Sequence, residues 1–122
     1  MINSKGILMV EPSANVLTEP LIDELTRKMT AAWRKRRESD YGYRGVHWCP
    51  CGTTSDNHDH FIGKGEGVLT NSLCIHYLAF HRNDLPKDEL DKVRALGFGE
   101  EEPTEDELRF PKRQSSRPTV YR

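Results

Sequence analysis

The chain has 122 residues and a formal net charge of −1, with 35% hydrophobic and 30% charged residues. A polar chain of this length holds about one domain, and its near-neutral balance excludes a whole-protein field that attracts nucleic acid or acidic membranes. No apolar run is long enough to cross a bilayer, so no membrane partner is expected.

Residues 1–15 are predicted to be a leader ahead of the folded unit. Their apolar stretch, residues 7–10, is followed closely by Pro12 and is too short for the core of a signal peptide. The three cysteines are odd in number, which does not fit an exported disulfide scaffold. Because thiols stay reduced in the cytoplasm, the sequence predicts a cytoplasmic protein.

The pattern of an amphipathic helix begins at Thr18, which is a suitable N-cap. Glu19 and Pro20 suit the first turn of such a helix. Apolar residues then recur at helical spacing and form one stripe that faces a core: Leu21, Ile22, Leu25, Met29 and Trp33. The sequence therefore predicts a long N-terminal helix.

Four consecutive cations end this helix, where positive charge complements the helix dipole. These residues, Arg34, Lys35, Arg36 and Arg37, follow directly on Trp33. An aromatic ring beside a basic run suits contact with phosphate or RNA, so the four are the candidate nucleic-acid-binding residues. A solvated helix end is the alternative interpretation.

Residues 38–44 are predicted to be a turn-forming link to a short strand. Apolar residues alternate in this strand with His47, Cys49 and Cys51, so that the three potential ligands share one face. Because Gly52 follows the second cysteine, the segment is similar to a zinc knuckle. The two cysteines are separated here by one residue, whereas the usual knuckle has two.

A β-hairpin is predicted next, with apolar pairs on both sides of the glycine-rich residues 63–67. Residues 70–72 are competent N-caps for a helix over residues 73–82, which is apolar almost all round and is expected to be the central element. Pro86 opens a further helix, and Gly97 supplies its stop.

The C-terminal end changes in composition. Residues 100–107 are almost all acidic, and residues 109–122 carry five basic side chains and two prolines. A segment of this kind buries too little apolar surface to order itself, so residues 100–122 are predicted to be a disordered tail. Thr104 and Glu107 have the spacing of a capping box, which allows one turn of helix there.

All three cysteines and all five histidines lie between His47 and His81. Thiolate and imidazole are the ligands that zinc prefers in proteins. The spacing from His76 to His81 falls within the range of structural zinc sites. The predicted ligands of one structural Zn²⁺ are therefore Cys49, Cys51, His76 and His81.

Other residues of the same region are alternative ligands. His47 is the first substitute if either cysteine does not bind the metal. His58, His60 and Cys74 are further substitutes. Cys74 is equally well explained as a core residue, since buried free cysteines behave as small apolar side chains.

Asp59 and His60, followed by a glycine-rich tip, then Asn71, then His81, resemble the order of residues in HNH-type endonucleases. The resemblance implies a metal-dependent nuclease built on a ββα unit. His60 would then be the base, Asn71 the positioning residue, and Asp59 and His81 the metal ligands. An N-cap of the following helix is the alternative role for Asn71.

The sequence predicts an α+β fold over residues 16–99, with an N-terminal helix, a knuckle and hairpin region, and two C-terminal helices. Four protein ligands leave zinc no open position for water, so a structural rather than an enzymatic role is expected. The main hypothesis is an interaction module for a protein or nucleic-acid partner, without an organic cofactor. The nuclease and a metal-free helical domain are the two alternatives.

Overall fold

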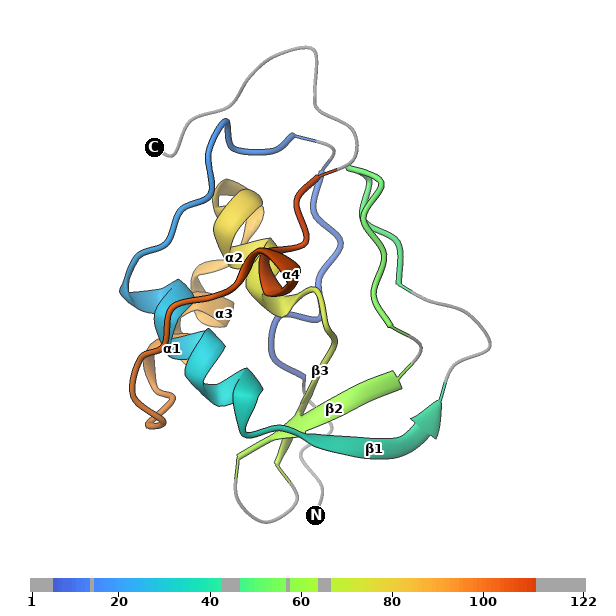
Figure 1. The fold of residues 1–122 in the computed structure, drawn as a ribbon, viewed down its shortest axis with the longest axis vertical. Helices are drawn as coiled ribbons and strands as arrows, with labels where there is room; N and C mark the ends of the chain where they lie inside the picture. The colour runs from blue at the N-terminus through green and yellow to red at the C-terminus, as the bar shows by residue number, and fades with distance from the viewer. Residues whose placement is uncertain (1–5, 14, 43–46, 57, 64–66, 112–122) are drawn as a thin grey trace.

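The computed structural model describes residues 6–13, 15–42, 47–56, 58–63 and 67–111. In chain order its elements are α1 (Glu24–Arg34), β1 (Arg37–Gly42), β2 (His58–Ile62), β3 (Val68–Thr70), α2 (Cys74–Phe80), the 3₁₀ turn η1 (Arg82–Asp84), α3 (Lys87–Arg94) and α4 (Glu105–Leu108). The predicted α+β class is confirmed. Figure 1 shows the sheet at the lower end of the view and the helices above it.

The sheet is antiparallel and has the strand order β1-β2-β3. The predicted hairpin is confirmed, with Phe61 of β2 opposite Leu69 of β3. The prediction of a turn-forming link over residues 38–44 is wrong, because residues 37–42 form β1 and pair with β2. This segment is polar and shows no apolar alternation, so its pairing with β2 has no local signal.

The first helix begins at Glu24 and not after Thr18 as predicted. Asp23 is its N-cap, and the Asp23 side chain accepts a hydrogen bond from a backbone N–H of the first turn. The preceding residues are not helical, because Leu17 and Leu21 donate their backbone N–H groups to carbonyls at the end of α2. These tertiary hydrogen bonds outweigh the local helical pattern.

The central element is α2, as predicted, and all seven of its residues are buried. Helices α1 and α4 pack against it. Ile7 and Leu8 are 1% and 0% exposed and belong to the same core, and Ile7 donates its backbone N–H to the carbonyl of Leu69. Ile7 and Leu8, which lie in the segment predicted to be a leader, therefore pack into the same core as α2.

The C-terminal segment also differs from the prediction, because residues 100–111 are ordered against the helices. Leu108 is buried, and the predicted capping box is formed at the start of α4. Ion pairs join Arg27 and Arg34 of α1 to acidic residues of this segment: Glu100, Glu101, Glu102 and Glu107. Four of the acidic side chains that predict disorder in isolation are thus paired with cations of α1. Residues 112–122 lie outside the described residues.

The last predicted helix is α3, which begins directly after Pro86 and ends before Gly97 as expected. Val93 of α3 is fully buried, and Leu90 and Leu96 pack against the core. Within the described part of the chain, every helix is too short or too polar to span a membrane.

Candidate metal centre

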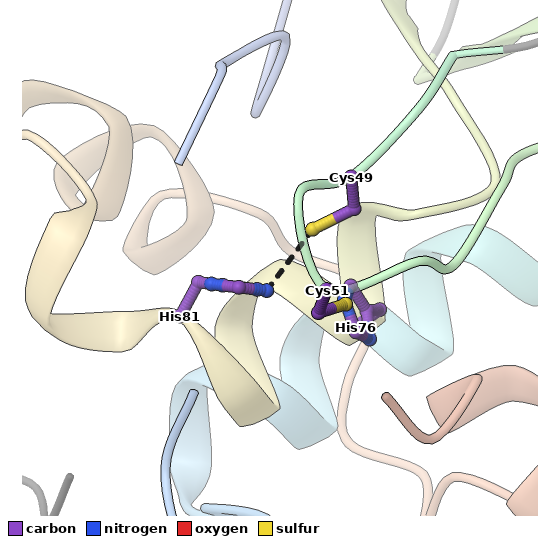
Figure 2. Close-up of side chains that lie close together, drawn as sticks. All are labelled: Cys49, Cys51, His76 and His81. Carbon is purple, nitrogen blue, oxygen red and sulfur yellow. Dashed lines mark hydrogen bonds between the residues drawn. The ribbon is translucent and has the colours of Figure 1, made fainter. Parts of the chain in front are cut away.

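Two cysteines and two histidines converge at the centre of the molecule. Their ligand atoms all lie within 4.8 Å of one another: Cys49, Cys51, His76 and His81. Sγ of Cys49 lies 3.1 Å from Nε2 of His81, and Sγ of Cys51 lies 3.3 Å from Nε2 of His76. All four side chains are buried, and Figure 2 shows the thiols of a loop facing the imidazoles of α2 and its C-cap. The structure thus brings together the four residues predicted as ligands.

The two cysteines lie in a tight turn, which we call the knuckle turn (residues 48–54). The backbone N–H of Gly52 donates to the carbonyl of Cys49, and the N–H of Cys49 donates to the carbonyl of Thr53, each at 2.8 Å. Gly52 has a φ of 93°, a conformation that favours glycine. The strand predicted to contain the cysteines is therefore wrong, because the chain reverses there to bring both thiols to one side.

The two histidines lie at opposite ends of α2. Side chains five residues apart on an ideal helix point about 140° away from each other. The helix ends at Phe80, and His81 is the C-cap with φ −123° and ψ 28°, outside the helical region. This change of backbone direction turns the His81 imidazole toward the thiols.

The second ring nitrogen of each histidine has its own surroundings. Nδ1 of His76 lies 3.2 Å from the carbonyl oxygen of Leu108, to which it donates, and Nε2 faces Cys51. Nδ1 of His81 lies 4.0 Å from a carboxylate oxygen of Asp84. The sequence analysis missed the role of Leu108, although the capping box just before it indicated an ordered turn.

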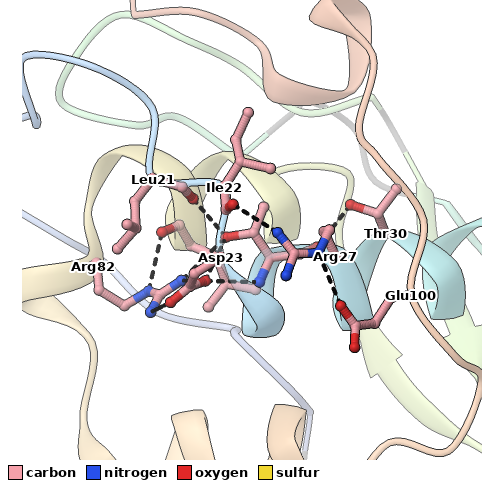
Figure 3. A network of polar contacts seen from close by, with 9 residues as sticks. Leu21, Ile22, Asp23, Arg27, Thr30, Arg82 and Glu100 are labelled. Atoms are coloured by element: carbon pink, nitrogen blue, oxygen red, sulfur yellow. Dashed lines mark hydrogen bonds and ion pairs between the residues drawn. The ribbon is translucent and has the colours of Figure 1, made fainter.

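The end of α2 is anchored to α1 by a buried cation. Arg82, which follows the candidate ligand His81, is 3% exposed and donates to both carboxylate oxygens of Asp23, at 2.6 and 2.9 Å. Its Nε also donates to the carbonyl of Leu78. Burial alone raises the pKa of Asp23, but the hydrogen bonds and charge of Arg82 hold this pKa below its usual value. Figure 3 shows the network at the junction of α1 and α2.

The two thiols of the knuckle turn differ in acidity. The hydrogen bond from Cys49 holds the pKa of Cys51 well below its usual range, and His76 and His81 lower it further. The thiol proton of Cys49 is shared with Cys51 in this hydrogen bond, which together with burial raises the pKa of Cys49. A divalent cation allows both thiols to ionise.

Cys74 is the third cysteine and lies apart from this group. It is fully buried in α2 and is not among the four converging residues. Burial raises the pKa of Cys74 to about 12, so its thiol stays protonated at neutral pH. These properties match the alternative interpretation of Cys74 as a core residue.

The residues that resemble a nuclease motif are used differently here. Nε2 of His60 lies 3.0 Å from a carboxylate oxygen of Asp56, and the His60 ring packs edge-on against Trp33. The side-chain oxygen of Asn71 accepts the backbone N–H of Leu73, the N-cap residue of α2. Among the described residues, no group of three or more potential metal ligands contains Asp59 or His60. His81, the last residue of the motif, faces the thiols instead.

His47, the first substitute ligand, also lies outside the converging group. The side chain of His47 is 38% exposed, and its Nε2 lies 3.7 Å from a carboxylate oxygen of Asp59. Burial raises the pKa of Asp59. His58 is the first residue of β2, and its side chain is not among those described.

The four candidate nucleic-acid-binding residues are exposed at and beyond the end of α1: Arg34, Lys35, Arg36 and Arg37. Arg34 forms ion pairs with two glutamates of the C-terminal segment. The guanidinium of Arg36 lies 4.1 Å from the ring centroid of Trp33, and that of Arg37 lies 5.9 Å from that of Phe61. Three of the four cations thus take part in an ion-pair network or in cation–π pairs.

Comparison of the chain with models of protein families, with curated proteins and with solved structures finds no match. Functional inference therefore depends on the geometry and chemistry of the residues described above.

Proposed function

We propose that Cys49, Cys51, His76 and His81 bind one structural zinc ion in a module that binds a partner. The observation that carries the proposal is the convergence of two thiols and two imidazoles within 4.8 Å. In a tetrahedral site with ordinary zinc bond lengths, sulfur and nitrogen ligands lie about 3.5 Å apart. The two sulfur–nitrogen distances of 3.1 and 3.3 Å are close to this value, and a tetrahedral S₂N₂ set is typical of zinc.

Burial supports a structural role for this ion. The four side chains are at most 2% exposed, and four protein ligands complete the coordination of zinc without water. The ion would tie the knuckle turn to both ends of α2. A small domain often needs such a link, because its core alone supplies little net stability.

Partner binding and location complete the proposal. A closed and buried site offers a substrate no metal position, which favours a binding role for the molecular surface over catalysis at the ion. The three cysteines are free, and free thiols beside histidines fit a reducing compartment. The proposed module is therefore cytoplasmic.

Metal analysis tests the zinc proposal directly. We expect protein purified without added zinc to contain one zinc ion per chain. Replacement by Co²⁺ is expected to give the intense visible absorption of a tetrahedral thiolate site, because both cysteines coordinate the ion. A protein that melts cooperatively with no stoichiometric metal would contradict the proposal and favour the metal-free helical domain.

The His60→Ala variant separates this proposal from the nuclease hypothesis. Loss of the buried ring and its contact with Asp56 is expected to reduce the free energy of unfolding by about 1–3 kcal/mol. The zinc content should stay at one per chain, because His60 is outside the ligand group. His47→Ala, at a more exposed position, is the matched control and should change stability by about 0.5 kcal/mol or less.

Nuclease assays of the same proteins complete this test. We expect no cleavage of plasmid DNA by the wild type in Mg²⁺, Mn²⁺ or Zn²⁺. Cleavage that disappears specifically in His60→Ala, with zinc content and folding intact, would establish the nuclease hypothesis instead.

A further inference from the structure

Trp48 is an unusually exposed aromatic residue beside the proposed zinc site. It is 70% exposed, whereas tryptophan is highly buried on average in folded proteins. Trp48 pairs with Thr54 across the knuckle turn in an antiparallel bridge. The backbone hydrogen bonds on either side of this pair run from Ser55 to His47 and from Cys49 to Thr53. Trp48 and Thr54 therefore lie opposite each other as a non-hydrogen-bonded pair. In such a pair the two side chains lie close together on one face.

Thr54 in turn lines an open hollow of about 360 Å³ between the knuckle turn and α4. The other residues that line it are Thr53, Glu105, Asp106, Arg109 and Phe110. Phe110 is 46% exposed, and its ring packs edge-on against Phe80 at a centroid distance of 5.2 Å. The hollow therefore has a fixed aromatic ring in its wall and the indole of Trp48 beside Thr54.

The charge of this hollow is negative. Glu105 and Asp106 are exposed, and within the described part of the chain neither carboxylate forms an ion pair or a side-chain hydrogen bond. Arg109 is the cation of the lining, and its Nη1 already donates to the carbonyl of Thr54 at 3.0 Å. Two carboxylates are thus left to meet an incoming cation.

We propose that this surface, formed by Trp48, Thr54, Glu105, Asp106 and Phe110, binds a basic peptide segment of a partner protein. A lysine or arginine side chain would enter the hollow, pair with the two carboxylates and lie against an aromatic face. Tryptophan is one of the residue types enriched among the strongest interface contacts. The carboxylates repel phosphate, so charge complementarity favours a peptide over a nucleic acid.

This inference rests on the proposed function, because the knuckle turn that carries Trp48 also carries two of the proposed zinc ligands. Zinc content and melting temperature are therefore measured on every variant used below. Failure of the zinc proposal would appear in the wild type as missing metal. Failure of the peptide inference would appear as absent binding by a folded, zinc-loaded protein.

The test is a titration of ¹⁵N-labelled zinc-loaded protein with an octapeptide of alternating lysine and alanine. The chain has two tryptophans, so the indole N–H signal of buried Trp33 is an internal control for that of Trp48. We expect the Trp48 signal to shift with saturation while the Trp33 signal stays in place. A glutamate–alanine octapeptide and a single-stranded oligonucleotide should leave both signals unchanged.

Two variants locate the binding surface. Trp48→Ala and the pair Glu105→Gln with Asp106→Asn should each weaken peptide binding about tenfold or more. Met9→Ala, which removes another exposed apolar side chain, is the matched control and should bind like the wild type. The inference is overturned if the Trp48 signal does not move, if both site variants bind normally, or if the oligonucleotide shifts Trp48 in place of the peptide.

Discussion

Cys51→Ser is expected to release the metal and unfold the domain. Binding of structural zinc supplies about 10–16 kcal/mol in small metal-dependent domains, which is comparable to the whole stability of a typical protein, about 5–15 kcal/mol. Serine is a poor zinc ligand, so the site would lose its closed coordination and the link between the knuckle turn and α2. Metal content and thermal unfolding followed by circular dichroism measure both effects. His81→Ala should behave in the same way.

Cys74→Ser is the matched control for this experiment, since it makes the same chemical change at a fully buried cysteine of α2. Because Cys74 is not in the ligand group, this variant should keep one zinc per chain and lose about 1–2 kcal/mol through burial of a hydroxyl group. The assignment of ligands is wrong if Cys51→Ser retains zinc or if Cys74→Ser releases it.

Arg82→Met is expected to cause the second large loss of stability. The change leaves the Asp23 carboxylate without its two hydrogen bonds and the carbonyl of Leu78 without its donor. Breaking a buried ion pair costs about 3–5 kcal/mol, and the partial exposure of Asp23 places the expected loss near about 3 kcal/mol. Urea unfolding of the zinc-loaded protein measures this change.

The exposed ion pairs of Arg34 provide the control for Arg82. The side chain of Arg34 is 35% exposed, and Arg34→Ala should cost about 1 kcal/mol or less, as is usual for pairs at the surface. If Arg34→Ala lowered the free energy of unfolding as much as Arg82→Met, burial of Arg82 would not explain the strength of its ion pair with Asp23.

Excess zinc distinguishes the Arg82 variant from the ligand variants. Arg82→Met keeps all four proposed ligands, so added zinc should raise its melting temperature by mass action. His81→Ala lacks a ligand and should gain little from the same addition. An equal response of both variants would show that the added zinc acts at another place.

The four residues of the candidate site are predictable from the sequence, but the backbone conformation that presents the cysteines is not. The crowding of cysteines and histidines was informative because zinc requires these donors in a small volume. Strand alternation was the expected way to place two thiols on one side. The observed turn, in which Gly52 has a positive φ, also places both thiols on one side over residues 49–51. Composition and spacing alone do not distinguish a strand from a turn at the two cysteines.

The basic run illustrates a different limit. Its four cations beside Trp33 favour a nucleic-acid contact when the local sequence is considered by itself. In the folded chain Arg34 is neutralised by glutamates more than sixty residues away in sequence. An estimate of surface charge from local sequence fails here, because the two segments meet only in the folded chain. The packing of α4 on α2 and the backbone hydrogen bond from Glu101 to Arg27 bring them together.

The sequence by itself determined the features that depend on local chemistry: the hairpin around its glycine-rich tip, the buried helix α2, the start of α3 after Pro86, and the candidate ligand set. Tertiary structure decided where α1 begins, that residues 37–42 form a strand, and that residues 6–13 and 100–111 join the fold. Each of these depends on a partner distant in sequence: the end of α2, β2, β3, or the guanidinium groups of α1. Local patterns predict the conformations that a segment favours, whereas distant hydrogen bonds and ion pairs select the one that it adopts.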